Sequence, residues 1–394
     1  MLASSGNLLQ WITISLLGVG VIMVSSASMS IGGEATTAAS LLGRPVVYAL
    51  IAVAVMFLIS YVDIRQIYTQ RGWTNPAAWL LILAVILSIL ALLPGFGRNV
   101  NGASRWLFLG PRSWNLSFQP SELAKWAMVL ALAWWGARYA GAMRRFFAGV
   151  LPALAVLIVV CGLIVIEDLG TAVLIGSVGL MMLLAAGARV WQFALMIPPA
   201  IAAVVGMILV SPYRMQRVTT FMDPWADAQG SGYHLIQSLV TISGAGPTGW
   251  GLGNGPLKYG YVPEDTTDFL FAIICHELGI AGATLVIGLY LALMWVGLGI
   301  VRDCRHAFGR LLGLGIIATI GCQAIMNMAV VTGTVPTKGI ALPLLSYGGT
   351  GWVMTAAALG LLAAIDRLNC LEAREEGEGD HQRADDLDDQ PALA

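Results

Sequence analysis

A cluster of acidic side chains stands where a long polar segment meets an apolar run. Glu264, Asp265 and Asp268 lie close together, and Phe269-Leu270-Phe271 follows Asp268 directly. An apolar setting and neighbouring negative charges both raise the pKa of a carboxylate toward the range in which it serves as a general base. We therefore predict that Asp268 is a catalytic base. The alternative is that Thr267 or Asp268 only caps the helix that follows.

Basic side chains are frequent in the polar segments of the chain. Guanidinium groups bind phosphate oxygens through paired hydrogen bonds, and an anionic, lipid-linked substrate such as a pyrophosphate would need a set of them. The alternative is that some are solvated loop charges. A glycine-rich stretch over 244–255 could add backbone N–H groups near an anion. The basic residues are Arg98, Arg105, Arg112, Arg214, Arg217, Lys258 and Lys338.

Two further charged sites stand at the edges of apolar runs, where ionisable residues are costly and are therefore candidates for function. Glu122 and Lys125 are three residues apart, so they share a helix face and can form an ion pair. The alternative to a functional role is that the two charges only neutralise each other. Asp168 precedes Leu169-Gly170-Thr171 and could either support the site or cap the helix that follows.

The composition shows that a membrane protein must position these residues. Of 394 residues, 58% are hydrophobic and 11% are charged, whereas soluble domains carry about 25% charged residues. Apolar runs long enough to cross a bilayer recur along the chain, and they lack the alternation of barrel strands. We predict an all-α, polytopic fold with ten spans, at about 8–28, 45–62, 76–94, 121–138, 147–166, 170–188, 191–210, 275–300, 310–331 and 345–366.

The distribution of charge predicts how these spans are oriented. An even number of spans places both termini on one side, and the excess of Lys and Arg in the loops of that side predicts that it is cytoplasmic. The long segments 95–120 and 211–268 then face outward, and loops of this length are usually functional. We predict one transmembrane domain over 1–366. The acidic segment 367–394 is predicted to be a disordered cytoplasmic tail.

Seven short motifs, in order, resemble the RodA/FtsW/SpoVE family, the SEDS proteins of shape, elongation, division and sporulation. The resemblance covers about residues 8–368, and the chain departs from the family pattern at Asp265, His276 and Thr350. The motifs are Gly102-Ala103-Ser104-Arg105-Trp106, Gln119-Pro120-Ser121-Glu122-Leu123-Ala124-Lys125, Asp168-Leu169-Gly170-Thr171, the segment 213–224, Gln237-Ser238, and the segments 263–269 and 342–349.

The resemblance implies a peptidoglycan glycosyltransferase of the plasma (inner) membrane. Such an enzyme polymerises lipid II into glycan strands during elongation or division, with undecaprenyl pyrophosphate as the leaving group. Asp268 matches the catalytic position of the family, and Glu122, Lys125 and Asp168 match positions associated with activity. We expect four residues to bind the pyrophosphate: Arg105, Arg214, Arg217 and Lys258. No protein metal site or other cofactor is predicted, although a divalent cation such as Mg²⁺ or Mn²⁺ could also screen the diphosphate.

The family also implies partners. These are lipid II itself, a class B penicillin-binding transpeptidase, other membrane proteins of the elongasome or divisome, and the lipid bilayer; no nucleic acid is expected. Two other functions stay open from the sequence. The chain could be a lipid II flippase, or it could be a non-catalytic scaffold for the transpeptidase.

Overall fold

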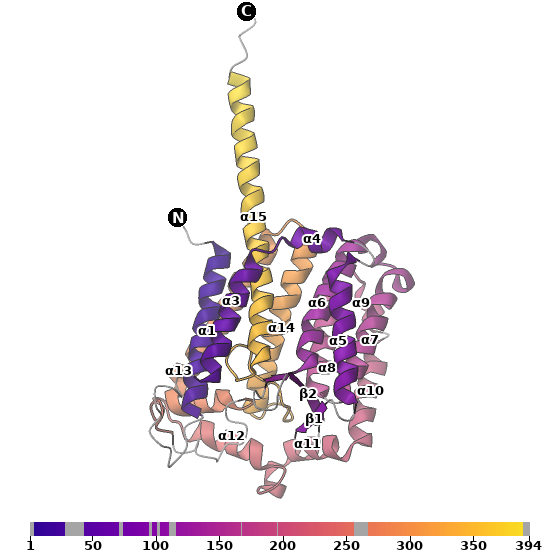
Figure 1. Ribbon diagram of the computed structural model, residues 1–394. Helices are drawn as coiled ribbons and strands as arrows, with labels where there is room; N and C mark the ends of the chain where they lie inside the picture. The colour runs from indigo at the N-terminus through magenta and orange to yellow at the C-terminus, as the bar shows by residue number, and fades with distance from the viewer. Residues whose placement is uncertain are drawn as a thin grey trace, which may run out of the picture.

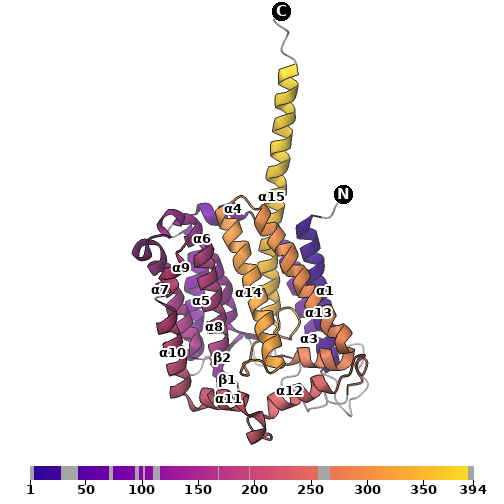
Figure 2. The same cartoon turned by 180° about the vertical axis from the view of Figure 1, so that it is seen from behind.

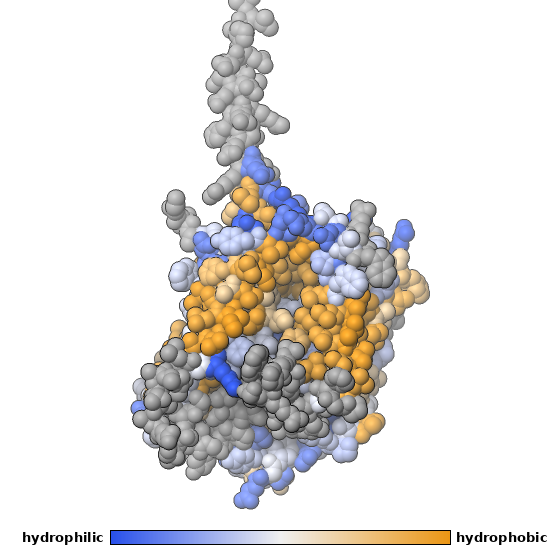
Figure 3. Space-filling model, viewed as in Figure 1, coloured by the Kyte–Doolittle hydropathy of each residue, from blue (hydrophilic) through white to orange (hydrophobic). Residues whose placement is uncertain are grey.

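The chain folds into a bundle of helices with both termini at one end. The computed structural model describes residues 4–27, 43–70, 74–93, 97–100, 103–109, 116–166, 168–194, 196–255 and 267–388. The short helices α11 and α12 and the strands lie at the end of the bundle opposite the termini (Figures 1 and 2). An apolar belt surrounds the middle of the bundle on the face shown in Figure 3, as a bilayer requires.

Helices occupy all ten positions that the sequence predicts for spans. Six of the described helical segments are long and apolar enough to cross a bilayer, and α3, α5 and α8 are shorter apolar helices. The main helices are α1 (Ser5–Ala27), α3 (Arg44–Ser60), α5 (Pro76–Leu92), α6 (Pro120–Arg138), α7 (Leu151–Val165), α8 (Leu169–Ala185), α10 (Ile197–Val210), α13 (Leu270–Asp303), α14 (Ala307–Val331) and α15 (Thr350–Asp388).

Short elements connect the main helices, and local sequence explains where several of them begin. Asn75 accepts a hydrogen bond from the N–H of Ala77 at 2.9 Å and so caps α5, whose first residue is Pro76. Pro198 and Pro199 lack the N–H that a continuous helix needs, and α10 begins beside them instead of continuing α9. The short elements are α4 (Ile64–Thr69), η2 (Ala140–Ala142), η3 (Phe146–Val150), α9 (Val190–Ala194), α11 (Pro212–Met222), η4 (Pro224–Asp227) and α12 (Tyr233–Ser243).

The prediction of an all-α fold was incomplete, because the segment 95–120 contains a small sheet. Strands β1 (Gly97–Val100), β2 (Ala103–Leu109) and β3 (Leu116–Phe118) pair antiparallel in that order. Aromatic and branched side chains pack well on a pleated surface, and β2 carries Trp106, Leu107 and Phe108 in succession. Because neighbouring side chains of a strand point to opposite faces, Leu107 is buried while Trp106 lines the cavity described below.

The acidic segment after position 366, for which the sequence predicts a disordered tail, is helical as far as residue 388 in the structure. Helix α15 continues without interruption to Asp388 and projects beyond the bundle in Figure 1. Extending an existing helix avoids the cost of nucleation, and Ala, Glu, Arg and Leu residues in this segment favour the helical state. The carboxylate of Glu372 also accepts hydrogen bonds from Arg65 and His306, which ties the extension to α4 and to the start of α14.

The glycine-rich stretch 244–255 packs against a break in α13. Gly279 has a φ of 62°, and the N–H groups of Trp250 and Gly251 donate to the carbonyls of His276 and Glu277 at 3.0 and 2.9 Å. The N–H of Gly253 donates to the carboxylate of Glu277 at 3.2 Å. The stretch therefore brings one backbone N–H group, that of Gly253, to a carboxyl group, and that group is a buried side chain of the protein itself.

Candidate functional site

A cavity of about 710 Å³ collects several of the predicted site residues. The elements around it are far apart in sequence and include parts of the segments 95–120 and 211–268, the start of α13 and the connection between α14 and α15. The lining residues that bear on chemistry are Trp106 from β2, Gln119 and Glu122 at the start of α6, Tyr213 and Arg217 from α11, Asp268 before α13, Gln323 from α14, and Lys338, Tyr347 and Trp352 from the connection and the start of α15.

Asp268 lines this cavity from the turn that leads into α13. It is partly buried, and its backbone carbonyl accepts a hydrogen bond from Nδ2 of Asn327 at 2.8 Å. The N-cap position of α13 is occupied by Phe269, so Asp268 is not the N-cap residue of this helix. The alternative assignment of Asp268 as an N-cap is therefore not supported.

Among the residues that the structure describes, two cations line the cavity together with Asp268. Arg217 donates to the carbonyl of Thr337 at 3.2 Å and lies over the ring of Tyr213, with its guanidinium carbon 4.6 Å from the ring centre. Lys338 comes from the neighbouring connection. Burial lowers the pKa of the Lys338 ammonium group, and the negative charge of Asp168 opposes this shift only in part.

Arg214 does not reach the cavity. Its guanidinium donates to the carbonyls of Val165 and Ile166 at 2.7 and 3.3 Å, where α7 ends. The last carbonyls of a helix have no partner within the helix, and a basic side chain at this position satisfies them and matches the helix dipole. Arg214 therefore holds α11 against the end of α7, while Arg217, about one turn later, faces the cavity.

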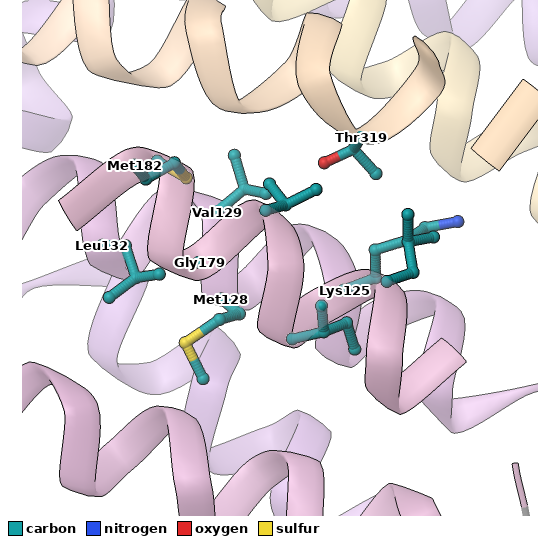
Figure 4. Close-up of a pocket in the computed structure, with 10 residues that line it drawn as sticks. Lys125, Met128, Val129, Leu132, Gly179, Met182 and Thr319 are labelled. Carbon is teal, nitrogen blue, oxygen red and sulfur yellow. The ribbon is translucent and has the colours of Figure 1, made fainter. Parts of the chain in front are cut away.

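Glu122 and Lys125 form the predicted ion pair, and a third residue completes it. The ammonium group of Lys125 lies 2.9 Å from Oε2 of Glu122 and 2.8 Å from Oε1 of Gln323. Lys125 is 1% exposed, whereas Glu122 lines the cavity. The stem of Lys125 borders an apolar space of about 10 Å³ beside Met128 and Thr319, and its nitrogen points away from this space (Figure 4). The pair therefore presents its carboxylate, and not its ammonium group, to the cavity.

Asp168 acts locally as a helix cap. Oδ1 accepts from the N–H of Thr171 at 3.0 Å, and Oδ2 accepts from the hydroxyl of Thr171 at 2.8 Å. Asp168 is buried and does not line the cavity, so its hydrogen bonds support the capping alternative. Its charge still favours the protonated form of Lys338.

Some predicted residues lie outside what the structure describes. Lys258 and Asp265 fall between the described ranges 196–255 and 267–388, and the side chain of Arg105 on β2 is likewise outside the description. His276 is buried, and its Nδ1 lies 3.0 Å from the carbonyl oxygen of Thr241; Thr350 is the first residue of α15. Within the described ranges, no three His, Cys, Asp or Glu side chains gather as a metal site.

The sequence did not single out two amide residues that the structure places beside the site. Gln323 and Asn327 lie four residues apart on α14 and are both buried. Polar side chains at this spacing in an otherwise apolar helix share one face, and that pattern was the available signal.

Comparison with known proteins gives the same family along almost the whole chain. A family model for FtsW, RodA and SpoVE, described as cell cycle protein, matches residues 7–370. The probable peptidoglycan glycosyltransferase FtsW of Thioalkalivibrio sulfidiphilus is 41% identical over 359 residues, covering 90% of this chain and 87% of that protein. Stage V sporulation protein E of Bacillus subtilis is 36% identical over 366 residues, covering 91% of this chain and 96% of that protein.

Solved structures agree with these sequence relatives. A chain from a peptidoglycan synthase complex superposes with a TM-score of 0.72 at 29% identity, covering 93% of this chain and 98% of that chain. The rod shape determining protein RodA of Thermus thermophilus gives a TM-score of 0.63 at 25% identity, with the same coverage of 93% and 98%. The chain belongs to the FtsW/RodA/SpoVE family of cell cycle proteins.

Proposed function

We propose that this chain is a peptidoglycan glycosyltransferase that polymerises lipid II into glycan strands. The single observation that carries the proposal is the cavity that holds a carboxylate, Asp268, together with two cations, Arg217 and Lys338. A base and a diphosphate-binding pair are what glycosyl transfer from a lipid-linked diphosphate needs. The family relatives named as peptidoglycan glycosyltransferases support the same reaction.

In the proposed reaction, Asp268 accepts the proton of the 4-hydroxyl group of the acceptor sugar. The resulting oxygen nucleophile attacks the anomeric carbon of the donor, and the bond to undecaprenyl pyrophosphate breaks on the opposite side. This single displacement inverts the α linkage to β and needs no covalent intermediate. Arg217 and Lys338 stabilise the negative charge that develops on the departing diphosphate. Arg105 and Lys258 remain candidates for the same role, and a divalent cation could assist them.

We further propose ten membrane crossings, with both termini in the cytoplasm and the cavity at the outer face of the plasma (inner) membrane. The helices at the ten predicted positions and the shared end of the two termini support this orientation (Figure 1). Figure 3 shows a hollow in the apolar belt between the lobe formed by α1 and α3 and the lobe formed by α5. This hollow is a suitable path for the lipid tail of the substrate.

The test is polymerisation of purified lipid II by the purified chain, alone and with its class B penicillin-binding transpeptidase. We expect glycan strands from the wild-type protein and none from an Asp268→Ala variant that still inserts and binds the transpeptidase. Absence of product from both wild-type assays, with folded protein confirmed, would support a scaffold. Retained transfer of lipid II between vesicle leaflets by Asp268→Asn, without wild-type polymerisation, would support a flippase.

The pH dependence of the reaction should show whether the charge of Lys338 contributes to substrate binding. Because burial lowers the pKa of Lys338, its charge is lost at a lower pH than that of an ordinary lysine. Binding of the diphosphate then weakens as pH rises through this pKa, so kcat/KM should fall on the alkaline side. Lys338→Arg stays charged and should move this decline to higher pH. Identical alkaline declines in the two proteins would show that Lys338 does not bind the substrate.

Arg217 and Arg214 form a matched pair of variants on α11. Losing a charge-assisted hydrogen bond to substrate costs about 1.5–3 kcal/mol, so Arg217→Ala should lower kcat/KM by about 10- to 100-fold. Arg214→Ala should instead lower the thermal midpoint, because it leaves the carbonyls at the end of α7 without their partner, and kcat/KM should stay near the wild-type value. Steady-state kinetics and thermal unfolding in detergent separate the two effects. Equal losses of kcat/KM would contradict the assignment.

A further inference from the structure

One buried amide on α14 binds two segments that are distant in the chain. Nδ2 of Asn327 donates to the backbone carbonyl of Asp268 at 2.8 Å and to that of Ile340 at 2.7 Å. An amide nitrogen carries two hydrogens, so these two bonds use its full donor capacity. Asn327 is 1% exposed, and water therefore does not compete for these bonds. The two carbonyl groups are consequently held on either side of a single nitrogen atom.

These two segments carry two of the groups that the proposed reaction needs. Asp268 itself belongs to the first segment. In the second, the N–H of Ile340 donates to the carbonyl of Lys338 at 3.0 Å, so a tight turn joins Lys338 to the residue that Asn327 binds. The amide of Asn327 thereby fixes the backbone that bears the proposed base relative to the backbone that bears a diphosphate-binding cation.

Gln323 anchors the same connection one helical turn earlier. Its Nε2 donates to the carbonyl of Ala341 at 2.8 Å, while its Oε1 accepts from the ammonium group of Lys125. Residues four apart lie on one face of a helix, so Gln323 and Asn327 of α14 both donate hydrogen bonds to the connection, to the adjacent carbonyls of Ala341 and Ile340. A site held by a regular helix is positioned more accurately than one held by loops alone.

The side-chain oxygen of Asn327 makes no hydrogen bond among the described residues, which indicates that the residue contributes through the two hydrogen bonds that its Nδ2 donates. Oδ1 is buried and has no hydrogen-bond partner in the described ranges. A buried polar atom without a partner costs free energy that an apolar side chain of similar size would avoid. An apolar residue at this position could not donate the two hydrogen bonds to the carbonyls of Asp268 and Ile340.

We propose that Asn327 is a positioning residue that sets the distance between Asp268 and Lys338 during glycosyl transfer. This inference rests on the proposed function. Displacing a catalytic group by about 1 Å can cost about 10²-fold in rate. Without the amide, the turn before α13 and the connection before α15 can separate, and the base moves relative to the sugar hydroxyl while the cations can still bind the diphosphate.

The test compares three variants of the full-length protein in lipid II polymerisation. Asn327→Leu should lower kcat by about 10²-fold with little change in KM, because positioning and not binding is lost. Asn327→Gln keeps the amide group on a longer stem and should restore part of kcat. The matched control is Thr319→Val, since Thr319 is also buried on α14 but its hydroxyl donates to the carbonyl of Gly315 in the same helix. This control should polymerise like the wild type.

Each outcome either supports or overturns the inference. A loss of kcat in Asn327→Leu with partial recovery in Asn327→Gln, for proteins of equal thermal midpoint or corrected for the folded fraction, supports it. Wild-type kcat in Asn327→Leu overturns it while the proposed function stands. Equal loss in all three variants shows a merely structural role and also overturns it. A wild-type protein that forms no glycan strands overturns the proposed function and, with it, this inference.

Discussion

An Asp268→Asn variant is expected to polymerise lipid II about 10²- to 10⁴-fold more slowly than the wild-type protein, the usual contribution of one well-placed base. Asparagine keeps the size and shape of the side chain but cannot accept the proton of the attacking hydroxyl group. Arg217 and Lys338 remain in the cavity, so the KM for lipid II should change little. The rate is measured as glycan strands formed from purified lipid II at saturating substrate.

Asp223→Asn is the matched control for this prediction. Asp223 lies in the same segment, 211–268, is exposed, and accepts a hydrogen bond from the N–H of Trp225 at 3.2 Å as the cap of η4. Asparagine caps a helix about as well as aspartate, so this variant should retain most of the wild-type rate. A similar loss in both variants would attribute the effect to the charge of the segment and not to a base at position 268.

Lys125→Met is expected to produce the largest loss of stability. Methionine replaces the buried stem of Lys125 but leaves the carboxylate of Glu122 without the ammonium group that lies 2.9 Å away. Lys125 is buried but Glu122 lines the cavity, so the loss should lie below the ~3–5 kcal/mol that breaking a fully buried ion pair costs. The measurement is the thermal unfolding midpoint of the purified protein in detergent, supported by the yield of folded protein in membranes.

The double variant Lys125→Met/Glu122→Gln isolates the cause of that loss. It removes the unpaired charge together with its partner, so it should recover much of the stability that the single variant loses. Recovery would show that the unpaired charge of Glu122, and not the packing of the Lys125 stem beside Met128 and Thr319, dominates the effect. A double variant as unstable as Lys125→Met would reverse this conclusion.

Sequence reasoning was most successful where the signal lies within a few neighbouring residues. The spacing of Glu122 and Lys125 predicts their contact because a helix brings residues three apart together. The order Asp168-Leu169-Gly170-Thr171 allowed a helix cap, and the structure shows the cap. The positions of the main helices likewise follow from uninterrupted apolar runs, because the membrane environment requires each span to satisfy its own backbone.

Sequence reasoning failed where the outcome depends on tertiary contacts or on a competition between states. Arg214 and Arg217 look equivalent in sequence, yet their different directions on α11 place one at the end of α7 and the other in the cavity. Asn327 gains its importance only because Asp268 and Ile340 come together in space. The composition of the acidic tail resembles that of a disordered segment, whereas in the structure residues 367–388 continue α15, because attachment to a preformed helix favours further helix.

An experimental structure of the protein with a non-reactive lipid II analogue would locate the substrate relative to Asp268, Arg217 and Lys338. We expect the diphosphate to lie between the guanidinium group of Arg217 and the ammonium group of Lys338, with a sugar hydroxyl within hydrogen-bond distance of the Asp268 carboxylate. An analogue whose diphosphate and sugars bind away from these three side chains, in a protein that still polymerises lipid II, would show that Asp268, Arg217 and Lys338 do not form the active site.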